Sequence, residues 1–93
     1  MVDYSFKVVA KLRNNLTTAE RCVALDKLHE WQKKLKIIRI DEVTYCKAQP
    51  IKNLDDFGAV ASFFCVLKDN DMKVFFDKLE YYDLDEGDKR VAV

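Results

Sequence analysis

The chain has 93 residues, of which 49% are apolar, and its 16 Lys and Arg residues balance 16 Asp and Glu residues. This length predicts a single domain over residues 1–93, and the apolar content excludes a disordered or low-complexity chain. Zero net charge argues against a generic polyanion binder, and no apolar run approaches the roughly 18 residues of a membrane span.

The start of the chain and its cysteines both indicate a protein of the cytoplasm. Residues 1–4 lack the basic and apolar regions of a signal peptide. The three cysteines, Cys22, Cys46 and Cys65, have no Cys-x-x-Cys spacing and predict neither a full disulfide framework nor a zinc site. We therefore expect buried free cysteines and a cytoplasmic location, in a host cell if the protein is viral.

The first part of the chain predicts a strand followed by a helix. Apolar and polar residues alternate over 4–12, as in a half-buried strand. Thr17 and Glu20 have the spacing of a capping box, and apolar residues recur at helical spacing after them. We expect a helix over 17–36.

The middle of the chain predicts two strands. Residues 37–45 are rich in β-branched side chains, but their alternation slips, which predicts a bulge near residues 41–42. Residues 47–57 contain the only proline and predict a long hairpin loop. Residues 58–68 are apolar on both faces, and we expect a central strand there.

The last part of the chain completes an α+β order. Apolar residues at helical spacing predict a second helix over 72–82, which ends at 83–87, and a short strand over 89–93. The order is that of the split-βαβ, or ferredoxin-like, two-layer sandwich. We therefore predict two helices on one face of a four-stranded antiparallel sheet.

Few residues suit catalysis or metal binding. The single histidine, His29, has no nucleophile indicated near it, and the two glycines form no phosphate-binding loop. The acidic turn at 83–88 lacks the spacing of a calcium loop. We expect no enzymatic activity, no cofactor and no metal; the enzymatic alternative is a small acylphosphatase-like hydrolase that uses Arg13 and Asn14.

Nucleic-acid binding is a further alternative. The segment 56–63 echoes part of the third-strand motif on which RNA-recognition modules stack bases. Ala59 and Ser62 stand in place of the stacking aromatic residues. Asp55 and Asp56 stand in place of a basic residue, so the motif is incomplete.

The predicted central strand carries apolar side chains on its second face as well. If Phe63 and its alternates face the helices, the other side chains form an apolar patch on the open sheet face. With the first strand, the candidate partner-binding residues of this patch are Val9, Val60, Phe64 and Val66. Exposed apolar patches usually mark interfaces, so we expect a protein partner there, with a homodimer as the first expectation.

Charge is unevenly distributed along the chain. Residues 1–47 hold ten basic and six acidic residues, whereas 48–93 hold six basic and ten acidic residues. In the predicted fold the corners at 33–39 and 68–73 share one end of the domain, which forms a basic pole. The candidate nucleic-acid-binding residues of this pole are Lys33, Lys34, Lys36 and Arg39.

An acidic turn follows the predicted second helix. Its candidate partner-binding residues are Asp83, Asp85, Glu86 and Asp88. Carboxylates at a helix C-terminus oppose the helix dipole by about 0.3–1 kcal/mol each, so helix stability does not explain them. We expect a cationic partner for this turn, either from another molecule or from Arg13 or Arg21.

These features together predict a small non-enzymatic protein-interaction module that self-associates and that binds and modulates a macromolecule. Small, glycine-poor, motif-free domains of this kind are common among virus-encoded accessory proteins that inhibit host factors, and by this association we expect an inhibitory role. A nucleic-acid-binding module that uses the open sheet face and the basic pole is the alternative. We expect no membrane association.

Overall fold

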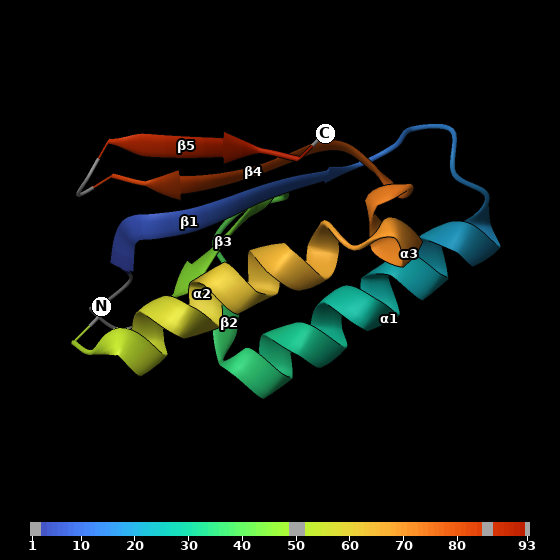
Figure 1. The fold of residues 1–93 in the computed structure, drawn as a ribbon. Helices are drawn as coiled ribbons and strands as arrows, with labels where there is room; N and C mark the ends of the chain where they lie inside the picture. The colour runs from blue at the N-terminus through green and yellow to red at the C-terminus, as the bar shows by residue number, and fades with distance from the viewer. Residues whose placement is uncertain (1–2, 49–51, 85–86, 93) are drawn as a thin grey trace.

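The chain folds into a five-stranded antiparallel sheet and three helices in a computed structural model that describes residues 3–48, 52–84 and 87–92 (Figure 1). The elements are β1 (Asp3–Leu12), α1 (Thr18–Leu35), β2 (Ile37–Arg39), β3 (Thr44–Lys47), α2 (Leu54–Leu67), α3 (Asn70–Lys73), β4 (Phe76–Asp83) and β5 (Asp88–Val91). The strand order β2-β3-β1-β4-β5 makes the first strand central. Helices α1 and α2 cover one face of the sheet, and the other face is open (Figure 1).

The predicted first strand is confirmed, and its alternation separates the two faces of the sheet. Val8 and Ala10 on β1 are buried beneath the helices. Because side chains alternate along a strand, Lys7, Val9 and Lys11 point to the open face.

The predicted first helix is also confirmed, with the capping box that the sequence contains. The Thr17 hydroxyl accepts a hydrogen bond from the backbone N–H of Glu20 at 3.1 Å, and a Glu20 carboxylate oxygen accepts one from the backbone N–H of Thr17 at 3.1 Å. The helix stops at Lys36, whose φ of 56° is left-handed. Ala24 and Leu28 are the buried residues on the inner face of the helix.

The single bulged strand predicted over 37–45 is wrong, because the chain reverses within it. The Asp41 carboxylate accepts hydrogen bonds from the backbone N–H groups of Val43 and Thr44 at 2.9 and 2.8 Å. These bonds close a turn at 40–43. As a result β2 and β3 form an antiparallel hairpin instead of one continuous strand.

The strand predicted over 58–68 is wrong, because this segment belongs to α2. The Asn53 side chain accepts a hydrogen bond from the backbone N–H of Asp56 at 3.0 Å and caps the helix. A run that is apolar on every side fits a buried helix as well as a buried strand. The buried side chains of α2 recur at helical spacing and are Val60, Phe63, Phe64 and Leu67.

The helix predicted over 72–82 is wrong, because only the four-residue α3 is helical and β4 follows it. Phe76 and Leu79 are both buried although they stand three residues apart. The register of β4 against β1 shifts between Lys11 and Leu12, and this irregularity breaks the simple alternation and imitates helical spacing. The predicted last strand is confirmed over 88–91, and Val93 lies outside the described residues.

The predicted α+β class with an antiparallel sheet is confirmed, but the sheet has five strands rather than four. The described helices number three rather than two, because α3 is added. The core lies between the sheet and the helices, and its largest fully buried side chains are Phe63, Phe76, Leu28, Leu67, Leu79, Val8 and Val60. Within the described residues, no helix has both the length and the apolar content to cross a membrane.

Candidate functional site

The apolar patch predicted for the open sheet face is not formed. Val60 and Phe64 lie on α2, where they are buried in the core. The centroids of the Phe64 and Tyr81 rings are 5.6 Å apart. Val66 is also on α2 and is partly buried. Only Val9 lies on the open sheet face, because the segment assigned to the central strand is a helix.

The predicted basic pole is divided between the two ends of the molecule. Lys33 and Lys34 lie in the last turn of α1, Lys36 caps that helix, and Arg39 is exposed on β2. Segment 68–73 lies at the other end, beside the N-terminal half of α1 (Figure 1). The reason is that α2 runs antiparallel to α1, so α3 comes back toward the start of α1.

The acidic turn joins β4 to β5 and does not follow a helix. Asp83 is the last residue of β4 and is buried, and Asp88 begins β5. Asp85 and Glu86 lie outside the described residues. The helix-dipole argument for an unexplained acidic cluster therefore does not apply.

The residues considered for chemistry are dispersed. The Arg13 Nε donates a hydrogen bond to the backbone oxygen of Phe76 at 3.3 Å. Asn14 instead lines the pocket between α1, β1 and the β2–β3 hairpin, and Arg13 is not among the residues that line it. Cys46 is buried as expected, but Cys22 and Cys65 are exposed, which corrects the prediction for those two. Among the described residues, no group of three His, Cys, Asp or Glu side chains is placed to hold a metal ion.

The open sheet face carries lysines in place of the predicted apolar patch. Lys7 and Lys89 stand on either side of Tyr82 in the row that crosses β1, β4 and β5. Lys11 on β1 stands directly opposite Lys78 on β4. We call these four lysines, together with Tyr82 and Glu80, the lysine face.

Glu80 is the central anion of the lysine face and is buried, with 4% of its surface exposed. Its carboxylate lies 2.7 Å from the Lys89 ammonium and 3.4 Å from the Lys78 ammonium, and it accepts a hydrogen bond from the Tyr82 hydroxyl at 3.1 Å. The hydrogen bond from Lys89 is the main reason why the pKa of Glu80 is lowered, against the effect of burial. The same bond raises the pKa of Lys89, so both groups are charged at neutral pH.

The aromatic ring of Tyr82 positions two of the lysines. The Lys7 ammonium lies 5.1 Å and the Lys89 ammonium 5.3 Å from the ring centroid, within the range of cation–π contacts. Among the described residues, Glu80 is the one carboxylate that lies within 4.0 Å of any of these four ammonium groups. The alternation of Lys7 and Lys11 was a signal in the sequence, but Lys78 and Tyr82 were hidden within a predicted helix.

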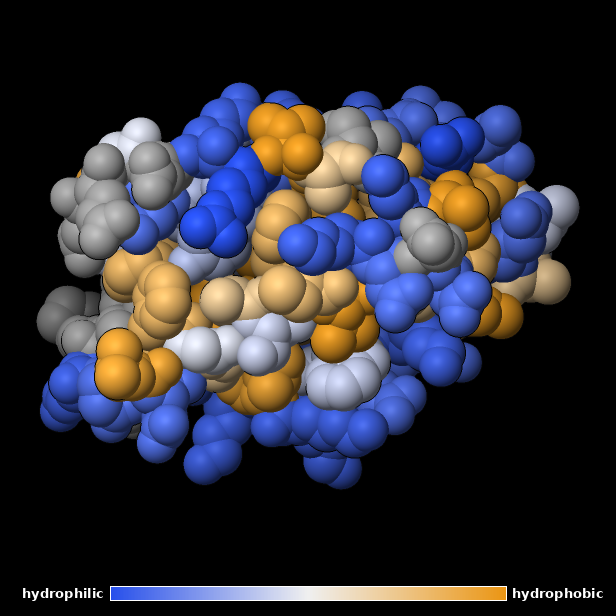
Figure 2. Space-filling view, viewed as in Figure 1, coloured by the Kyte–Doolittle hydropathy of each residue, from blue (hydrophilic) through white to orange (hydrophobic). Residues whose placement is uncertain are grey.

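A second surface is an apolar groove between α1 and α3, with a volume of about 470 Å³. Its apolar lining residues are Val23, Trp31, Val66, Met72 and Phe75. Lys27, Asp69 and Asp71 complete the lining. Hydrophobic side chains are visible among polar ones at the right of Figure 2, where α3 and the start of α1 lie.

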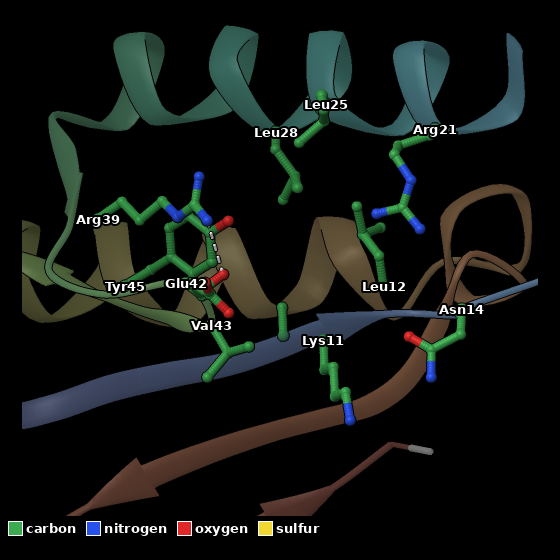
Figure 3. Close-up of a pocket in the computed structure, with 11 residues that line it drawn as sticks. Lys11, Leu12, Asn14, Arg21, Leu25, Leu28, Arg39, Glu42, Val43 and Tyr45 are labelled. Carbon is green, nitrogen blue, oxygen red and sulfur yellow. Dashed lines mark hydrogen bonds between the residues drawn. The ribbon is translucent and has the colours of Figure 1, made fainter. Parts of the chain in front are cut away.

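A third surface is a pocket of about 410 Å³ between α1, β1 and the β2–β3 hairpin, here called the α1 pocket (Figure 3). Its apolar lining residues are Ala10, Leu12, Leu25, Leu28 and Val43. Arg21 extends from α1 at one end, and Arg39 and Glu42 lie at the other end (Figure 3). Burial raises the pKa of Tyr45, which also lines the pocket, so its phenol is neutral at neutral pH.

Comparisons with known proteins point to no family. No protein-family model, no curated protein and no solved structure matches the chain. A functional proposal therefore has to be argued from the geometry and charge of the three described surfaces.

Proposed function

We propose that the protein is a non-enzymatic binding module that holds single-stranded nucleic acid on the open face of its sheet. The observation that carries this proposal is the lysine face, in which Glu80 and Tyr82 hold ammonium groups on three neighbouring strands. We further propose that the strand order β4-β1-β3-β2, with α1 and α2, is a split-βαβ core to which β5 is added at the edge.

The arrangement of the lysine face suits a phosphate backbone. Neighbouring strands are about 4.8 Å apart, so the four ammonium groups are distributed over a surface that an extended strand can cross. Lysine binds phosphate as a point charge and does not require a fixed planar geometry. Among the described residues, no carboxylate oxygen lies within 4.0 Å of the ammonium groups of Lys7 and Lys11, so these two are the strongest candidates for phosphate contacts.

The same geometry favours binding without sequence preference. Lys7 and Lys89 both lie over the Tyr82 ring, which leaves that ring poorly placed to stack with a base. Val9 and Val91 flank Glu80 in the adjacent row and offer only small apolar contacts. We therefore expect binding that depends on phosphate charge and weakens steeply as salt is added.

A comparison of two double variants tests this function. Fluorescence anisotropy with a labelled oligothymidylate should show weaker binding by Lys7→Gln/Lys11→Gln than by the unchanged protein. Each lost phosphate contact reduces the slope of log K against log salt by about 0.7 for a single strand, so the slope should become shallower by about 1.4. Lys27→Gln/Lys33→Gln on α1 is the matched control, since it removes the same charge from exposed positions off the sheet.

The control variant Lys27→Gln/Lys33→Gln also tests whether the predicted basic pole contributes to binding, because Lys33 belongs to that pole. Equal weakening by the two double variants would show that overall charge, and not the lysine face, drives binding. Absence of binding at about 50 mM salt would overturn the proposed function outright.

A protein-interaction module that self-associates is the second candidate function. The observation that favours it is the apolar groove between α1 and α3, where Trp31, Met72 and Phe75 gather. Such side chains are enriched at the centres of protein interfaces. The sequence predicts self-association on the open sheet face, whereas this candidate places it in the groove between α1 and α3, because the open sheet face carries the lysines.

A further inference from the structure

We infer that the α1 pocket is a binding site for a small molecule that has an apolar body and one anionic group, a carboxylate or a phosphate. The volume of about 410 Å³ lies within the range of small-molecule sites. This pocket is separate from the apolar groove between α1 and α3. The inference does not rest on the proposed nucleic-acid binding.

The anionic group is assigned to the end of the pocket that holds Arg21. Its guanidinium donates a hydrogen bond to the backbone oxygen of Arg13 at 3.2 Å, which ties the side chain to the β1–α1 loop. Among the described residues, no carboxylate oxygen lies within 4.0 Å of the Arg21 guanidinium. Asn14 lines the pocket in the same loop and offers a side-chain amide as a further donor.

The local field at this end also favours an anion. Arg21 lies at the N-terminal end of α1, where the helix dipole is positive and a cation is unfavourable on its own. The nearest acidic residue in sequence, Glu20, is already used by the capping box with Thr17. A bound carboxylate or phosphate would therefore supply the charge that this end of the pocket lacks.

The apolar body is assigned to the middle of the pocket. Leu12, Leu25 and Leu28 lie between the two arginines, as Figure 3 shows. Lys11 also lines the pocket, and in the same view its ammonium group projects away from these leucines.

The far end of the pocket is lined by residues of the β2–β3 hairpin. Arg39 donates hydrogen bonds to the backbone oxygens of Asp41 and Glu42 at 2.9 and 3.0 Å. The Glu42 side chain lines this end and would repel a second anionic group. The expected ligand therefore has a single anionic head group on an apolar body, and not anionic groups at both ends.

Titration of the ¹⁵N-labelled protein with three naphthalene probes tests the inference: naphthoate, naphthyl phosphate and the neutral naphthamide. We expect amide shifts at Asn14, Arg21 and Val43 with the anionic probes and binding at least about tenfold weaker for the amide. The anionic probe that binds more tightly identifies the head group. Equal binding of naphthamide and both anions, or shifts confined to other surfaces, would overturn the assignment.

Two variants on the same helix make the test specific. Arg21→Met removes the charge and keeps an apolar chain of similar length, and it should weaken binding of the anionic probes by about tenfold or more. Lys27→Met makes the same change outside the pocket and should leave binding unchanged. Similar affinity for Arg21→Met and the unchanged protein would contradict the site, and the naphthamide comparison decides the matter if the variant does not fold.

Discussion

Glu80 shows at the scale of one residue how the open face is organised. A carboxylate with 4% exposure must be compensated by the groups around it, which here are Lys89, Lys78 and Tyr82. Since its folded-state pKa is lowered, Glu80 stabilises the protein above its unfolded pKa near 4.5, and this contribution is lost as the pH falls through the lower folded-state pKa.

The variant Glu80→Gln tests this linkage. We expect a loss of about 1 kcal/mol at pH 7, because the partner lysines are half exposed, and a smaller loss below about pH 4. Thermal unfolding from neutral to acidic pH measures both values. Lys89→Gln removes the main cause of the lowered pKa and should flatten the same part of the profile. A constant difference between Glu80→Gln and the unchanged protein at every pH would show that the carboxylate is not stabilised as described.

At the scale of the element, the end of α1 contains a residue in an unfavourable conformation. Lys36 adopts a φ of 56°, which costs a residue with a Cβ about 1–2 kcal/mol relative to glycine. Lys36→Gly should therefore stabilise the protein by about 1 kcal/mol in urea unfolding. Lys33→Gly, three residues earlier within the helix, should destabilise it by a similar amount. An equal loss of stability in the two variants would show that α1 does not end at Lys36.

Sequence patterns predicted the elements well where one structure alone satisfied them. The alternation of β1 and the capping box at Thr17 each specify one kind of element, and both predictions are confirmed. The run at 58–68 is apolar on all sides, so its pattern fits a helix and a strand equally well. The signal for a helix is the cap at Asn53, but from the sequence this residue is predicted to lie in a hairpin loop. The bulge opposite Leu12 similarly disguised β4 as a helix.

Those two misassigned elements explain why the candidate site was misplaced. With α2 taken for a strand, its core residues Val60 and Phe64 were assigned to the open face. With β4 taken for a helix, Lys78 and Tyr82 were removed from the face on which they stand opposite Lys11 and Lys7. The lysine face depends on pairing between strands far apart in the chain, and such pairing is not encoded in local periodicity.

At the scale of the whole molecule, the zero net charge conceals a face that opposes self-association. Two copies that met through their sheets would bring eight lysines of the lysine face together, and like charges at an interface are strongly unfavourable. We therefore expect no dimer through the sheet faces and, if the proposed nucleic-acid function holds, a monomer in sedimentation equilibrium at about 50 mM salt, where charges are weakly screened.

The same experiment separates the two candidate functions. A dimer that Val23→Glu dissolves, while Lys7→Gln/Lys11→Gln leaves it intact, would contradict the expected monomer and assign self-association to the groove between α1 and α3. Val23 is 49% exposed and lines that groove, so a carboxylate there should disrupt an apolar contact without disturbing the core. Leu54→Glu is the matched control, because Leu54 is 84% exposed at the start of α2 and does not line the groove. A dimer lost on Lys7→Gln/Lys11→Gln would instead contradict the repulsion on which the monomer prediction depends.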